Sequence, residues 1–91
     1  MTVYMVEREL KGISMEDLGA AQRAAIDKAA EMRSGGARIT YIRSTFAPAD
    51  GRCMCLFEAG SDALVRQLND DARIPYTKVV EALDLTPRPA Q

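Results

Sequence analysis

The chain has 91 residues, of which 47% are hydrophobic and 27% charged, which suits a single globular domain with one core. Its 12 basic and 13 acidic residues give a formal net charge of -1, and no run of Lys and Arg forms a footprint for phosphates, so a nucleic-acid-binding surface is not expected. No apolar stretch is long enough to predict a membrane span.

The first half of the chain predicts a strand, a helix and a second strand. Residues 3–9 alternate like a strand, with Val3 and Met5 on one face. Ser14 is placed as the N-cap of a helix whose apolar residues recur at three- and four-residue spacing, and Gly35-Gly36 ends it. Residues 38–46 form the next strand. Strict alternation puts Ile39, Tyr41, Arg43 and Thr45 on one side of that strand and Thr40, Ile42, Ser44 and Phe46 on the other.

The second half repeats this plan. Residues 47–51 are a turn by composition, and residues 52–58 alternate as a strand. A second helix begins at Ser61 or Asp62 and ends before Ile74-Pro75, because proline disfavours helix at the preceding residue. Residues 77–85 form the last strand.

The doubled order β-α-β-β-α-β predicts an α+β fold of the ferredoxin-like type, a four-stranded antiparallel sheet with two helices on one face. Residues 1–86 are expected to form this single domain, and residues 87–91 a flexible C-terminal tail. The other face of such a sheet needs a partner, and a second copy of the chain is the simplest one. We therefore expect a homodimer.

Several segments resemble one known family. They are Tyr4-Met5-Val6-Glu7-Arg8, the aromatic-containing strand at 39–44, Cys55-Leu56-Phe57-Glu58-Ala59, Ala72-Arg73-Ile74-Pro75 and Lys78-Val79-Val80-Glu81. Together they cover roughly residues 4–85, and their order resembles the bacterial family called domain of unknown function 4242. The resemblance implies a ferredoxin-like homodimer related to the dimeric α+β barrel group, with a cavity beside the sheet. It also implies nickel as a ligand, because one branch of that family is described as nickel-binding.

Two cysteines offer a soft metal site. Cys53 and Cys55 lie two apart on one strand face, a spacing at which an unstrained disulfide is not expected, so reduced thiols fit better. With Glu7 and Glu58 they make a candidate set of ligands for nickel or another divalent metal. The competing interpretation is that both cysteines are small apolar residues that pack beneath a helix or line a dimer interface. The sequence contains no histidine.

A small hydrophobic molecule is the other candidate ligand. The polar-tipped residues expected to reach a cavity are Tyr4, Arg8, Tyr41, Arg43 and Cys55. The competing interpretation of Arg8 is an ion pair with a nearby acid near the dimer seam. Tyr4 and Tyr41 could equally pack on the sheet with their hydroxyls at its rim.

A cofactor-free enzyme of specialised metabolism, of the cyclase, isomerase or monooxygenase type, is the alternative function. Analogy with the wider fold group suggests it. In that case Glu7, or Glu58 on a parallel neighbouring strand, acts as acid and base, while Tyr41 or Arg43 stabilises an enolate. The absence of histidine excludes His-based catalytic triads, and no glycine-rich phosphate loop predicts a nucleotide cofactor. With no basic and apolar leader at the N-terminus, we expect a cytoplasmic protein.

Overall fold

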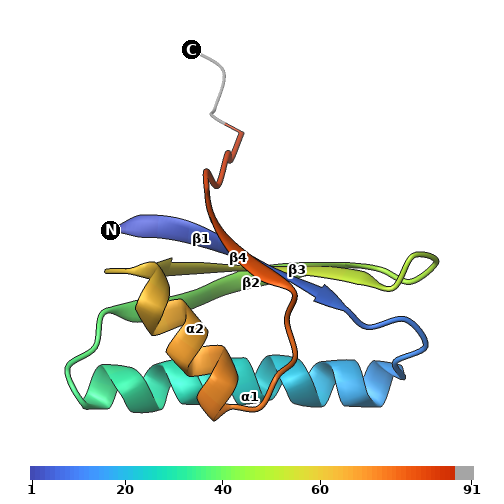
Figure 1. Ribbon diagram of the computed structural model, residues 1–91, viewed down its shortest axis with the longest axis horizontal. Helices are drawn as coiled ribbons and strands as arrows, with labels where there is room; N and C mark the ends of the chain where they lie inside the picture. Colours follow the sequence, from blue (N-terminus) through green and yellow to red (C-terminus); the bar gives the residue numbers. More distant parts are fainter. Residues whose placement is uncertain (88–91) are drawn as a thin grey trace.

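The computed structural model describes residues 1–87 and has the predicted order of elements (Figure 1). These are β1 (Thr2–Glu9), α1 (Met15–Ser34), β2 (Ile39–Ala47), β3 (Arg52–Ala59), α2 (Asp62–Asp71) and β4 (Lys78–Ala82). The strands form one sheet in the order β2-β3-β1-β4, and all neighbours are antiparallel. Both helices lie on the same side of the sheet. The ferredoxin-like α+β prediction is confirmed.

α1 begins and ends where its capping residues stand. The Ser14 side chain accepts a hydrogen bond from the backbone N–H of Asp17 at 3.0 Å, which satisfies one of the free donors of the first turn. At the other end, Ala37 N–H donates back to the Met32 carbonyl at 3.0 Å, and Gly36 takes a φ of +97°. Both predicted ends of this helix are therefore confirmed.

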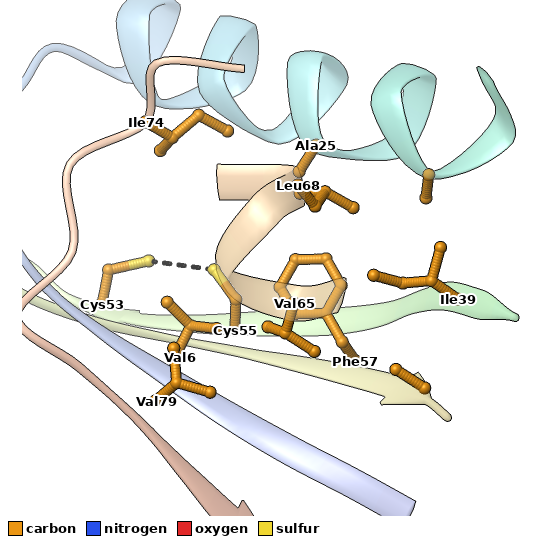
Figure 2. Packing of buried hydrophobic residues seen from close by; sticks show 12 residues of the cluster. Val6, Ala25, Ile39, Cys53, Cys55, Phe57, Val65, Leu68, Ile74 and Val79 are labelled. Carbon is orange, nitrogen blue, oxygen red and sulfur yellow. Dashed lines mark hydrogen bonds between the residues drawn. The ribbon is translucent and has the colours of Figure 1, made fainter. Parts of the chain in front are cut away.

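The core lies between the two helices and the sheet (Figure 2). α1 contributes alanines, which let its backbone approach the strands closely. α2, capped by Ser61, contributes larger side chains. The fully buried apolar side chains of greatest volume come from three strands and from α2, and are Phe57, Ile39, Leu68, Val6 and Val65.

A β-bulge in β2 changes which of its side chains face the helices. The pairing with β3 shifts between Tyr41, opposite Phe57, and Arg43, opposite Leu56. The extra residue reverses the alternation, so Tyr41 and Ser44 share the helix side while Arg43 faces the other way. Strict alternation, which placed Tyr41 and Arg43 on one face, was wrong at this point.

Two further strand predictions need correction. β4 ends at Ala82 rather than at residue 85, because its pairing with β1 stops at the partner Val3. β1 and β3 are antiparallel rather than parallel, since a hairpin joins β2 to β3. Of the predicted tail at 87–91, residues 88–91 lie outside the described residues.

One face of the sheet carries no helix. Alternation puts on this open face a set of apolar side chains from three strands, Val3, Met5, Met54, Leu56 and Val80. The segment after β4 leaves the sheet on this same side, and its Leu83 and Leu85 are exposed (Figure 1). Within residues 1–87, neither helix is long and apolar enough to cross a membrane.

Candidate functional site

A pocket of about 230 Å³ opens between α1 and the sheet. α1 supplies a mainly apolar wall that includes Leu18, Ala21 and Ala25. The strands supply the opposite wall, which carries polar groups. The wall residues come from β1, β2 and β3 and are Arg8, Tyr41, Ser44, Phe46, Cys53 and Cys55. Ile74 closes one side of the pocket. The pocket is thus apolar with a few convergent polar groups, the usual character of a small-molecule site.

The two cysteines lie side by side at the sheet wall of this pocket (Figure 2). Their Sγ atoms are 3.9 Å apart, and both thiols are free. Burial, and then the neighbouring Cys55, raise the pKa of Cys53 to about 11. Cys53 therefore keeps its proton at neutral pH and can donate it toward the Cys55 sulfur.

Arg8 is a buried cation beside this pair. The residue is 3% exposed, and its guanidinium donates to Asn69 Oδ1 at 2.6 Å, to the Pro75 carbonyl at 3.1 Å and to Cys55 Sγ at 3.4 Å. The three acceptors are an amide oxygen, a backbone carbonyl oxygen and a sulfur, and none of them is a carboxylate. No carboxylate in the described part of the chain forms an ion pair with it. A buried charge is costly unless it is paired, so the pocket has a strong preference for negative charge near Arg8.

A chain of hydrogen bonds runs from the pocket mouth to Cys55. Gln22 Nε2 donates to the Tyr41 hydroxyl at 3.0 Å, and that hydroxyl lies 2.5 Å from Ser44 Oγ. Ser44 Oγ in turn donates to Cys55 Sγ at 2.9 Å. The Tyr41 ring is held by an edge-to-face contact with Phe57, with ring centroids 5.5 Å apart. Ser44 is therefore the member of this chain that donates to the sulfur of Cys55.

The fold brings together only part of the predicted site. Arg8, Tyr41 and Cys55, which were predicted to reach a cavity, line the pocket together with Cys53, which was predicted only as a metal ligand. Tyr4 packs against the core without lining the pocket.

The remaining predicted residues lie on the open face. Arg43 bonds to Asp84 there, and Glu58 lines a shallow hollow on the same face. Glu7, near the end of β1, lies opposite Met54, whereas Glu58 of β3 lies opposite Val3, near the start of β1. The structure does not place either glutamate beside the cysteines or beside Tyr41. Neither the four-residue metal set nor the Glu–Tyr catalytic pair is assembled within one chain.

Glu7 has a structural role of its own. Its carboxylate accepts from Lys78 Nζ and from Arg52 at 3.1 Å each. The hydrogen bond from Lys78, followed by that from Arg52, lowers the pKa of Glu7 from its usual 4.5. This ion-pair cluster joins β1 to both of its neighbours at one end of the open face.

The lowered pKa of Glu7 predicts a pH dependence of stability. Since the folded state holds the carboxylate more acidic than the unfolded chain does, the contribution is present above pH 4.5 and is lost as pH falls through the lower folded value. We expect the difference in unfolding free energy between wild type and Glu7→Gln to shrink below pH 4.5. Urea unfolding of both proteins at about pH 6 and about pH 3, at matched protein concentration, measures it. A constant difference would show that the ion pairs contribute nothing.

Sequence reasoning missed Asn69 and Ser44. Asn69 is fully buried in α2, where its Nδ2 donates to the Val65 carbonyl at 2.8 Å and its Oδ1 accepts from Arg8. A signal was present, because Asn69 falls on the apolar stripe next to Leu68 and a polar residue there must find a partner. Ser44 was assigned to the face opposite Tyr41, because the bulge between them has no simple sequence signature.

Comparisons with known proteins place the chain in a family. Residues 4–82 match the model of the SCO4226-like family, described as nickel responsive protein SCO4226-like. The chain belongs to this family. The earlier resemblance to the 4242 family pointed to the same kind of protein. No curated protein sequence matches the chain.

The fold also matches a solved structure, SCO4226 from Streptomyces coelicolor A3(2), with a TM-score of 0.77 and 20% identity. The alignment covers 92% of this chain and 99% of the other. At this identity the likeness supports the fold alone.

The residues of one chain do not suit nickel well. Within residues 1–87, no group of three or more His, Cys, Asp or Glu side chains lies close enough together to hold a metal ion. The sequence also has no histidine, the imidazole donor that nickel commonly takes. The cysteine pair supplies two sulfur donors and no third protein ligand.

Proposed function

We propose that this protein binds a small, largely apolar molecule carrying a negatively charged group, in the pocket between α1 and the sheet, and that it does so as a homodimer. The buried and uncompensated charge of Arg8 in a mainly apolar pocket is the observation that carries this proposal. An anionic group near Arg8 would offset its desolvation, while the apolar body contacts the α1 wall.

The Arg8 guanidinium has free capacity for such a group. It has five N–H donors, and three hydrogen bonds are formed with Asn69, Pro75 and Cys55. Tyr41 and Ser44 stand at the same wall and orient a polar head group further. The pocket volume of about 230 Å³ suits a molecule of roughly ten non-hydrogen atoms rather than a nucleotide or a haem.

Octanoate and 1-octanol are a matched pair of probes for this proposal, because they have the same hydrocarbon chain and differ in charge. We expect octanoate to bind more tightly, and Arg8→Met to weaken octanoate at least about tenfold while leaving octanol unchanged. Arg8→Lys keeps the charge and should restore part of the affinity. Titration followed by amide chemical shifts measures the affinity and the location together.

Thermal unfolding of both Arg8 variants is the folding control, since Asn69 loses its partner in Arg8→Met. Equal affinity for octanoate and octanol, or shifts confined to residues outside the pocket, would overturn the proposal.

The dimer is proposed to form through the open face of the sheet. The face has an apolar centre on β1 and β3 and ion pairs toward its ends, which is the usual anatomy of an interface. A second copy is its simplest occupant.

Nickel is a second candidate ligand, and the family description supports it. Because one described chain offers no three-ligand group, a nickel site would need donors from both copies of the dimer. Elemental analysis of protein purified without a nickel column, and then equilibrated with nickel and dialysed, tests this. Retention of about one nickel per dimer would support a shared site, and retention of none would remove nickel from consideration.

A further inference from the structure

The surroundings of Cys55 resemble those of a sulfur atom that carries negative charge. Cys55 Sγ accepts from Arg8 Nε at 3.4 Å and from Ser44 Oγ at 2.9 Å, and it lies 3.9 Å from Cys53 Sγ. Neutral thiols are weak acceptors. Deprotonated or metal-bound sulfur is stabilised by neighbouring cations and hydrogen-bond donors.

The separation of the two sulfurs fits one bridging ion. Thiolate–metal bonds of about 2.3 Å, as thiolates make to zinc, join sulfurs 3.9 Å apart at an angle of roughly 115°. This angle suits a three-coordinate ion. Because both cysteines line the pocket, the third position is open to a water or a small neutral ligand there.

The charge of the site selects among soft metals. Two thiolates and a monovalent ion carry one net negative charge, which neutralises Arg8. Two thiolates and a divalent ion such as nickel carry none, so the buried guanidinium stays uncompensated. In the described part of the chain no carboxylate forms an ion pair with Arg8, so no further negative charge enters this balance of charges. Among the metals that soft thiolate ligands select, Cu(I) is the monovalent one.

We propose that Cys53 and Cys55 bind one monovalent thiophilic metal ion, Cu(I), with Arg8 as the counter-charge. This site goes beyond the organic ligand proposed above and does not depend on it. On binding, each S–H bond present in the free protein is replaced by a Cu–S bond, and its proton passes to solvent. Copper stays Cu(I) throughout, so no oxidant or reductant takes part. Loading therefore tightens as pH rises.

The experiment titrates the reduced, full-length protein with Cu(I) in competition with bicinchoninate, without oxygen, and follows the absorbance of the bicinchoninate complex. We expect wild type to withdraw one Cu(I) per chain. Cys53→Ser and Cys55→Ser should each weaken binding at least about 100-fold, because each removes one of two sulfur ligands. Arg8→Met should weaken it about tenfold and Arg8→Lys much less.

Met32 of α1 lies outside the pocket lining and supplies the matched control. Met32→Leu removes a thioether of similar volume, and its copper affinity should equal that of wild type. X-ray absorption of the loaded wild-type protein gives a readout independent of any variant, and it should show two sulfur neighbours. Failure of wild type to compete with bicinchoninate, wild-type affinity in the double serine variant, or copper bound only by nitrogen and oxygen would each overturn the proposal.

The two proposals are separable. Each is tested on the wild-type protein, copper by competition with bicinchoninate and octanoate by amide chemical shifts. A protein that binds copper but not octanoate would retain the metal site and remove the organic ligand. The reverse result would retain the ligand pocket and remove the metal site.

Discussion

Gly51→Ala is expected to destabilise the protein by about 3 kcal/mol or more, which would lower its melting temperature by more than about 10 °C. Gly51 is buried at the end of the turn between β2 and β3, with a φ of +76°. A Cβ there would lie 2.5 Å from the Cβ and backbone N of Lys11. The backbone of Lys11 cannot move away easily, because the neighbouring Leu10 N–H donates to the Gly51 carbonyl at 2.6 Å.

Gly36→Ala is the matched control for this effect. Gly36 also has a positive φ, +97°, but a Cβ there would meet nothing within 4 Å. We therefore expect it to cost only the conformational strain, about 1 kcal/mol. Thermal and urea unfolding of both variants at one protein concentration separate strain from collision. Equal losses in the two variants would mean that the loop at Lys11 gives way freely.

Met5→Lys is expected to convert the proposed homodimer into a monomer. Met5 lies at the centre of the open face, opposite Leu56 on β3 and Val80 on β4. In a dimer its replacement would place two unpaired charges in the apolar centre of the interface, a cost of several kcal/mol. In an isolated chain the same position is only partly covered, so the fold should persist.

Light scattering after gel filtration measures the change. Wild type should have twice the chain mass of 10.0 kDa, and Met5→Lys that mass itself. Gln67→Lys, which adds the same charge to the exposed surface of α2, should remain dimeric and is the matched control. A monomeric wild type, or dimers in all three proteins, would contradict assembly through the open face.

The boundaries of the helices could be predicted because their signals are local. Ser14 and Gly36 set the ends of α1 through contacts within a few residues, and Ser61 does the same for the start of α2. The ferredoxin-like order followed from two repeats of one pattern. The strand ends were less certain: residues 83–85 continue the alternation of β4, but they have no partner on β1.

The pocket could be anticipated only in part. Arg8 and Cys55 were identified as candidates because a cationic side chain and a thiol within predicted strands are chemically distinctive. Glu7 and Glu58 were expected beside them, but alternation puts both side chains on the open face. The antiparallel pairing of β1 with β3 then separates them, because Glu58 lies opposite Val3 at the other end of β1 from Glu7. Because of the bulge after Tyr41, Ser44 lines the pocket wall in place of the predicted Arg43.

The sequence by itself determined the elements, their order and the apolar faces, since periodicity, caps and breakers act over a few residues. Only the tertiary structure decided which side chains share the pocket. The contacts of Arg8 with Asn69 and Cys55 span 61 and 47 residues of sequence. They depend on strand register and on one bulge. A shift of a single residue in β2 moves every following side chain to the opposite face of the sheet.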